Sequence, residues 1–76
     1  MAKLPILRPK EVLRALRRAG FYIHHQTGSH ARLLDPTRTG RVTVPIHPGD
    51  LPAFVVMSVI RPAGLTKEEF LSLLDE

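Results

Sequence analysis

A histidine that follows a tight turn is the residue best suited to chemistry in this chain. The segment Gln26–His30 reads Gln-Thr-Gly-Ser-His and lies between two runs rich in strand-forming residues, 21–26 and 31–34. Gly28 can adopt a positive φ, so the segment predicts the turn of a short β-hairpin. His30 then opens the second strand on rigid backbone. Histidine exchanges a proton near neutral pH, so His30 is a candidate general acid or base.

Strand alternation predicts which side chains share a face with His30. Strands are expected over 21–26, 29–34 and 41–46, and the face turned away from the apolar residues is expected to carry Tyr22, His24, Gln26, His30, Arg32, Arg41 and Thr43. The same alternation places His25 on the core side, partly buried and hydrogen-bonded. Acid/base groups, cations and hydrogen-bond donors together suit phosphodiester cleavage of RNA, in which the substrate supplies its own 2′-hydroxyl nucleophile.

Other chemistries have weaker support in the residue pattern. No base and orienting group surround Ser29, which argues against a nucleophilic serine. The chain has four histidines and no cysteine, without the spacing of a preformed zinc site, so no metal or other cofactor is expected. His47, in a Pro-Ile-His-Pro turn, is expected to have a structural role. Gly28 is expected to let RNA approach the turn closely.

Positive charge is concentrated in the first part of the chain. Nine of the 11 Lys and Arg residues precede position 48, whereas five of the seven Asp and Glu residues follow it. This asymmetry fits either a nucleic-acid partner or solubility. A predicted helix over 9–19 has one apolar stripe and an opposite basic one, formed by Lys10, Arg14, Arg17 and Arg18. The basic stripe is interpreted either as a phosphate-binding surface or as a solvated helix face.

The predicted elements define an α+β fold in a single domain over residues 1–76. The order is α-β-β-β-α(-α), with a three-stranded antiparallel sheet and helices on one face. Pro45 indicates that the third strand is an edge strand or ends near this residue, because proline would break a central ladder. A second helix is expected within 51–64, where Phe54–Ile60 forms core or, if exposed, a contact with a partner or a second copy. Thr66 and Glu69 form a capping box that opens a last helix ending near Leu74.

The cellular location is predicted to be cytoplasmic. The chain has no apolar run long enough to cross a bilayer, and its N-terminus lacks the apolar region of a signal peptide. A chain without cysteine has no disulfide framework. No contact with a membrane is expected.

The quoted turn and a later segment together resemble a known family. Residues 8–73 are similar to the HicA (YcfA-like) toxins, chiefly through Gly28-Ser29-His30 and the run Val42–Gly49, which includes Pro-Ile-His-Pro. The resemblance implies a fold similar to a double-stranded-RNA-binding domain and a metal-independent endoribonuclease that cleaves mRNA, with His30 as the catalytic histidine. It also implies a cognate HicB-type antitoxin that covers the active face. The free protein is expected to be a monomer or a weak dimer.

Two other functions fit the residues. A non-catalytic RNA-binding module of the same fold would hold RNA through phosphate contacts and shape. A partner-binding domain without RNA affinity would use Phe54–Ile60 for assembly. The residues expected to contact RNA in the ribonuclease are Lys10, Arg14, Arg17, Arg18, His24, Gly28, Ser29, Arg32 and Arg41.

Overall fold

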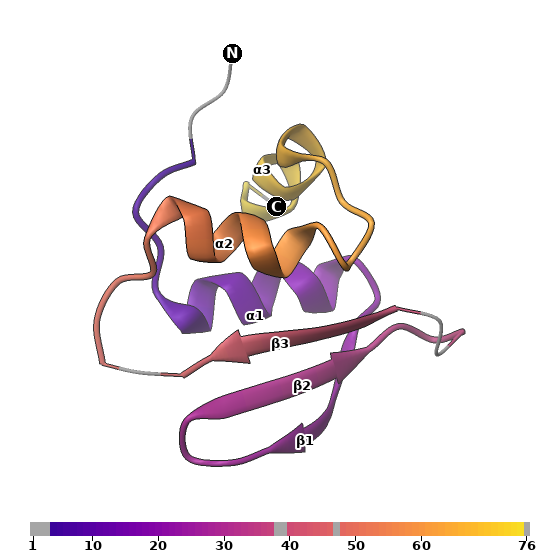
Figure 1. Cartoon of the computed structure of the whole chain (residues 1–76). Helices are drawn as coiled ribbons and strands as arrows, with labels where there is room; N and C mark the ends of the chain where they lie inside the picture. The colour runs from indigo at the N-terminus through magenta and orange to yellow at the C-terminus, as the bar shows by residue number, and fades with distance from the viewer. Residues whose placement is uncertain (1–3, 38–39, 47, 76) are drawn as a thin grey trace.

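The computed structural model has a three-stranded sheet covered on one face by helices (Figure 1). It describes residues 4–37, 40–46 and 48–75. The elements are α1 (Pro9–Arg18), β1 (Tyr22–Gln26), β2 (His30–Leu34), β3 (Arg41–Pro45), α2 (Ala53–Ile60) and α3 (Lys67–Leu74). The predicted α+β fold and element order are therefore confirmed.

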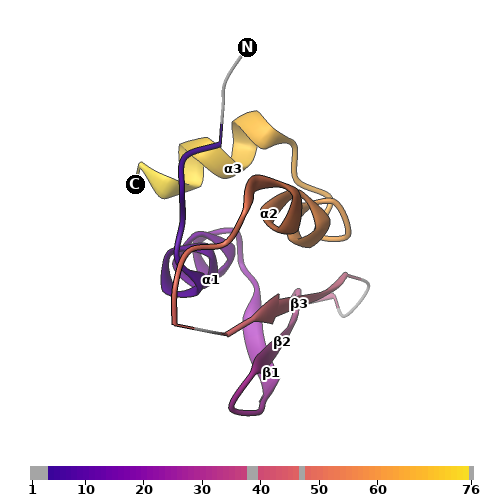
Figure 2. The same ribbon diagram turned by 60° about the vertical axis from the view of Figure 1, so that its left-hand side comes forward.

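Three layers are visible when the molecule is turned (Figure 2). The helices α1 and α2 lie side by side over the sheet, and α3 lies on their far side. The sheet is antiparallel in the order β1-β2-β3, so β3 is an edge strand, as Pro45 predicted. The opposite face of the sheet is not covered by any helix of the described chain.

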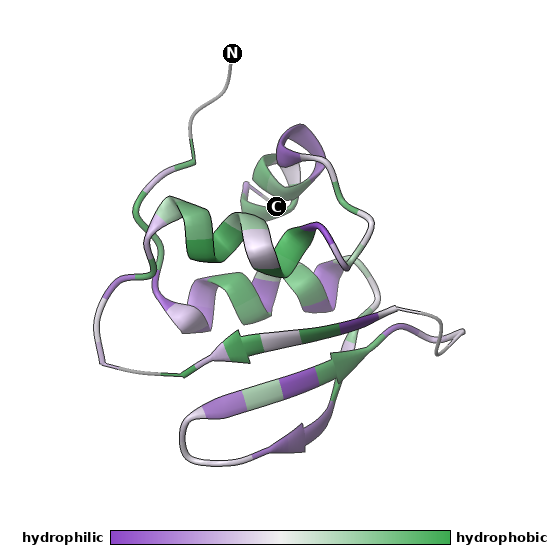
Figure 3. Cartoon of the chain, in the orientation of Figure 1, coloured by the Kyte–Doolittle hydropathy of each residue, from purple (hydrophilic) through white to green (hydrophobic). Residues whose placement is uncertain are grey.

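The core forms where the sheet meets α1 and α2. Alternating residues of β2 and β3 point into it, and the strands show this alternation in their hydropathy (Figure 3). Phe70 of α3 is completely buried, so the third layer is part of the same core. The buried hydrophobic residues are Leu7, Val12, Ala15, Leu16, Phe21, Ala31, Leu33, Val42, Val44, Leu51, Val56, Val59, Ile60 and Phe70.

Local signals set the ends of the helices. Gly20 has a φ of 102°, and the amides of Gly20 and Phe21 donate to the carbonyls of Arg17 and Leu16, which closes α1 in a Schellman motif. The predicted capping box of α3 is present, because Glu69 N–H donates to Thr66 Oγ1 at 3.0 Å and Thr66 N–H to Glu69 Oε1 at 2.8 Å.

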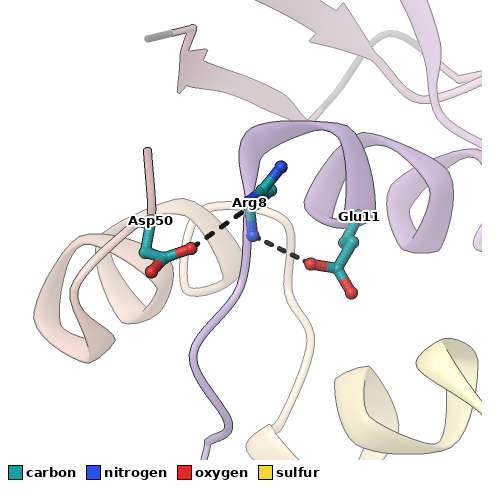
Figure 4. A network of polar contacts seen from close by, with 3 residues as sticks. All are labelled: Arg8, Glu11 and Asp50. Atoms are coloured by element: carbon teal, nitrogen blue, oxygen red, sulfur yellow. Dashed lines mark hydrogen bonds and ion pairs between the residues drawn. The ribbon is translucent and has the colours of Figure 1, made fainter. Parts of the chain in front are cut away.

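The N-terminus of α1 is tied to the loop before α2 (Figure 4). The amide of Arg8 donates to Glu11 Oε1 at 3.0 Å, and Arg8 Nε lies 3.8 Å from Asp50 Oδ1. Both ion-pair side chains are largely exposed, so the pair adds little stability. The buried bridge between Leu7 and Leu51 makes the stronger link between these two segments.

The helix α2 is shorter and less buried than predicted. It begins at Ala53 because Leu51 is held in the bridge to Leu7, where its amide donates to the Leu7 carbonyl at 2.6 Å. α2 is apolar around most of its surface (Figure 3). Phe54, expected in the core or, if exposed, at a contact with a partner or a second copy, is 75% exposed, since the sheet and α3 together take up only the face that carries Val56, Val59 and Ile60.

Candidate functional site

The hairpin turn is held by a threonine side chain. Thr27 and His30 face each other across the turn, and the Thr27 amide donates to the His30 carbonyl at 2.8 Å. The Thr27 hydroxyl accepts the amides of Ser29 at 3.3 Å and His30 at 3.1 Å. A side-chain oxygen that receives two amides restricts the backbone on which His30 is carried.

The ring of His30 is oriented by its neighbour. Ser29 Oγ lies 3.0 Å from His30 Nδ1, and the Ser29 carbonyl accepts the amide of Ile46 at 2.7 Å, which ties the turn to the end of β3. Whichever of the two groups donates the proton in that hydrogen bond, Nε2 of the exposed ring stays available for exchange with a ligand. His30 thus lies at the start of β2, as predicted, and its side chain is exposed.

A β-bulge in β1 changes which side chains lie on the same face of the sheet as His30. The register pairs Ile23 with Leu33, and His25, not His24, with Arg32, so one extra residue is inserted in β1. Residues directly opposite in a sheet share a face. His25 therefore lies on the uncovered face with Arg32, and the prediction that His25 is partly buried on the core side is wrong, because the side chain is exposed.

The same bulge reverses the prediction for Gln26. Its partner in the register is Ala31, a buried residue of the covered face, so Gln26 does not join the uncovered face. Gln26 nevertheless remains exposed, because it lies at the end of the outer strand. His24 stays on the uncovered face, as predicted, since both residues of a bulge can point to one side of the sheet.

Two neighbouring hollows mark the uncovered face. One of about 270 Å³ is lined by His25, Thr27, His30, Arg32 and Thr43. The other, of about 390 Å³, is lined by His24, Arg32, Leu33, Leu34, Arg41, Val42 and Thr43. Arg32 and Thr43 line both, so three histidines and two arginines are collected on one continuous surface.

The arginines of this surface are available to a ligand. Arg32 and Arg41 are exposed, and neither forms an ion pair with any residue that the structure describes. A guanidinium without a carboxylate partner is suited to bind a phosphate through two parallel hydrogen bonds. The surface therefore combines a positioned imidazole with free cations.

Comparison with models of protein families identifies the family of this chain. The model of the HicA toxin of bacterial toxin–antitoxin systems matches residues 9–65. The chain belongs to the HicA toxin family. It is accordingly a toxin whose counterpart is an antitoxin protein, and the resemblance seen in the sequence is confirmed. No curated protein matches the chain.

The family match ends before the last helix. α3 (Lys67–Leu74) lies beyond residue 65, yet it contributes Phe70 to the core. In this HicA-family toxin, α3 is therefore an integral part of the folded unit. Among the described residues, no helix is long and apolar enough to cross a membrane.

The basic stripe of α1 is on a different surface from His30. α1 packs over the covered face of the sheet, with α3 on its other side. Arg18 Nη1 donates to the carbonyls of Leu73 at 2.7 Å and Leu74 at 3.4 Å, so this predicted RNA contact closes the last turn of α3. Arg14 lines a groove between α1 and α3.

The side chains of Lys10 and Arg17 are exposed on α1 and make no hydrogen bond or ion pair with the described part of the chain. The structure thus divides the predicted RNA-binding residues into two groups. Those of the sheet and hairpin lie on the uncovered face or at the turn that carries His30, whereas those of α1 lie in the helical layers.

Gly28 differs from the prediction in its backbone. Its φ is outside the left-handed region, unlike those of Gly20 and Gly64. A Cβ added to Gly28 would meet no atom within 4 Å. Neither backbone conformation nor internal packing therefore requires glycine here, which is consistent with the expected close approach of a ligand.

Metal ligation has no support in the described residues. Within residues 4–37, 40–46 and 48–75, no group of three or more His, Asp or Glu side chains could hold a metal ion. His47, predicted to be structural, lies outside the described residues.

Two residues of the site were missed by sequence reasoning. The role of Thr27 could have been predicted, because a Thr hydroxyl in a turn often accepts backbone amides two or three residues later. The role of His25 could not, because alternation along β1 gives it the wrong face, and only the pairing with β2 reveals the extra residue.

Proposed function

We propose that this toxin is an endoribonuclease that cleaves mRNA without a metal ion, with His30 as a general acid or base. The observation that carries the proposal is the placement of the His30 ring. Its Nδ1 is hydrogen-bonded to Ser29 Oγ at 3.0 Å, and it lines one hollow with Arg32. Membership of the HicA family supports the same function.

The proposed reaction uses groups found on the uncovered face. An imidazole accepts the proton of the RNA 2′-hydroxyl, and the arginines stabilise the negative charge that develops on the phosphate oxygens. The nucleophile belongs to the substrate, so the protein needs only to position the phosphate and move protons. Exposure of the site allows a polymer to enter it.

The RNA path follows the two hollows. We place one phosphate at Arg32, which lines both, and a neighbouring phosphate at Arg41 with His24 beside it. Gly28 and Ser29 contact the RNA at the turn, where no side chain at Gly28 obstructs the backbone. Lys10, Arg14 and Arg17 on α1 are outer phosphate contacts for longer RNA, with Arg18 contributing only if it leaves the α3 carbonyls.

The proposed antitoxin is a HicB-type protein that covers this face and so blocks RNA. The toxin then acts in the cytoplasm, where mRNA is available, and is a monomer or a weak dimer when free. Exposed Phe54 is the residue on which a second copy would dock.

The test uses purified protein separated from antitoxin. Wild type is expected to cleave single-stranded RNA in EDTA, and His30→Ala to lose about 10²- to 10⁴-fold in rate. An RNA with a 2′-deoxynucleotide at each cleavage position is the matched substrate control, because it lacks the nucleophile, and it is expected to stay intact.

The alternative of a non-catalytic RNA-binding module predicts a different result. Wild type and His30→Ala would then bind RNA equally, with salt-sensitive affinity, and neither would cleave it. Intact RNA from folded wild-type protein would therefore overturn the ribonuclease proposal. In cells, growth arrest with loss of mRNA in wild type alone would support it.

A further inference from the structure

The bulge in β1 places a second histidine beside the first. His25 pairs with Arg32, and it lines the 270 Å³ hollow together with His30. Regular alternation would have turned His25 towards the helices, where it could not reach a ligand on the uncovered face. The irregularity is thus what brings the two imidazoles to one hollow, and bulges frequently re-aim side chains at active sites.

We propose that His25 is a second catalytic residue, which exchanges a proton with one RNA oxygen while His30 exchanges a proton with the other. The inference rests on the ribonuclease function proposed above and adds a residue to it. Either histidine alone supplies one proton transfer, whereas cleavage involves two.

The separation of the two histidines suits a single phosphate. Thr27 pairs with His30 across the turn and His25 with Arg32, so His25 and His30 are diagonal neighbours on the same face. Diagonal neighbours in an antiparallel pair lie about 7–8 Å apart. Each ring can then reach about 3 Å to an oxygen on its own side of one phosphorus atom.

Arg32 completes this arrangement. It is directly opposite His25 and two residues after His30 on the same strand, so it flanks the space between the two rings. A guanidinium there can bind the non-bridging phosphate oxygens and hold the phosphorus between the histidines. Thr43, opposite Arg32 on β3, adds a hydroxyl to the same row.

The rings of His25 and His30 together account for both proton transfers of the reaction. One neutral imidazole takes the 2′-hydroxyl proton as the bond from the 2′-oxygen to phosphorus forms. The other ring, as an imidazolium, gives its proton to the 5′-oxygen as the bond from phosphorus to that oxygen breaks. The products are a 2′,3′-cyclic phosphate and a 5′-hydroxyl end, with no oxidant, reductant or further reactant.

The charged surroundings of His25 come from two strands. Arg32 faces it directly on β2, His30 lies on its diagonal, and His24 precedes it on β1. β3 contributes the uncharged Thr43 to this hollow and Arg41 to the next one. His24 lines only the second hollow, away from His30, so it is a binding residue rather than a partner in proton transfer.

The decisive experiment compares His25→Gln with His25→Lys and His24→Gln. We expect His25→Gln to lower kcat on RNA by about 10²- to 10⁴-fold with KM near that of wild type, and to remove one limb of a bell-shaped pH profile. His25→Lys places a positive charge at this position but cannot exchange a proton near pH 7, so it is expected to be equally slow. His24→Gln is expected to raise KM and keep both limbs.

A second substrate shows whether His25 donates or accepts a proton in the reaction. Nucleoside 3′-(4-nitrophenyl phosphate) esters have a leaving group that needs no acid. Recovery of the His25→Gln rate on these esters identifies His25 as the proton donor, and a persistent defect identifies it as the acceptor. Both results support the proposal.

Two results would overturn it. If His25→Gln retains kcat and both pH limbs, or if its defect is confined to KM and is restored by His25→Lys, His25 only binds RNA or is idle. Wild-type cleavage that depends on His30 but not on His25 sinks this inference alone, whereas intact RNA from wild type sinks the proposed function. Circular dichroism and an unchanged urea midpoint confirm that these variants of an exposed residue are folded.

Discussion

Arginines lie on two surfaces of this toxin, and their contacts differ between the two. On the uncovered sheet face, Arg32 and Arg41 are exposed without an ion-pair partner among the described residues. Between α1 and α3, Arg18 donates to two backbone carbonyls of the last turn of α3, which have no partner within the helix. The first surface is available for a ligand, whereas the second holds the fold together.

This difference shows that a concentration of positive charge in the sequence does not by itself tell which arginines are available to a ligand. Both sets of arginines belong to the basic first part of the chain. Only the contacts of each guanidinium separate an arginine that is available to a ligand from one that caps a helix.

Truncation of the α3 anchor is expected to have the largest effect. Phe70 is completely buried, so Phe70→Ala should lower the free energy of unfolding by about 3–5 kcal/mol. That is a large share of the stability of a domain of this size. Urea denaturation measures the loss, with Ser72→Ala on the exposed side of α3 as control. A loss below about 1 kcal/mol would mean that α3 is dispensable to the fold.

Substitution of one arginine on each surface by alanine tests directly whether one surface binds RNA and the other stabilises the fold. Arg32→Ala should weaken RNA binding by about 1.5–3 kcal/mol, because a charge-assisted phosphate contact is lost, while stability changes by less than about 0.5 kcal/mol. Arg18→Ala should instead lower stability by about 1 kcal/mol and leave the salt dependence of RNA binding as in wild type. RNA titrations at several salt concentrations and urea denaturation report both. A shallower salt dependence in Arg18→Ala would place Arg18 among the phosphate contacts.

Loss of the Thr27 hydroxyl should have a modest effect on stability and on the cleavage rate. Thr27→Val removes the acceptor of two amides, so we expect a loss of about 1 kcal/mol of stability and a several-fold lower cleavage rate. Thr27→Ser retains the hydroxyl and should behave like wild type. Equal behaviour of the Val and Ser variants in denaturation and cleavage assays would show that the side-chain hydrogen bonds do not position His30.

The glycine substitutions Gly28→Ala and Gly20→Ala should change stability by about 1 kcal/mol or less, in opposite directions. Gly28→Ala has open space and no left-handed φ, so stability should stay the same or rise by up to about 1 kcal/mol, while RNA affinity falls because a methyl group enters the ligand path. Gly20→Ala, at a φ of 102°, should lose about 1 kcal/mol of stability. Unchanged RNA affinity in Gly28→Ala would exclude close approach of RNA at the turn.

Interactions between near neighbours in the chain were accessible from the sequence. The hairpin around Gly28, the stop at Gly20 and the capping box of Thr66 and Glu69 each depend on residues only a few positions apart. The element order and the position of His30 at the start of β2 follow from these local signals together with apolar periodicity. The family resemblance rests on the same segments.

Features that depend on contacts between distant segments were decided by the tertiary structure. The bulge that turns His25 to the uncovered face exists only in the pairing of β1 with β2. Arg18 meets its acceptors 55 and 56 residues away, and Phe54 is exposed because packing on α2 uses another face. Alternation and charge patterns describe one segment at a time, so they cannot report which partner a segment meets.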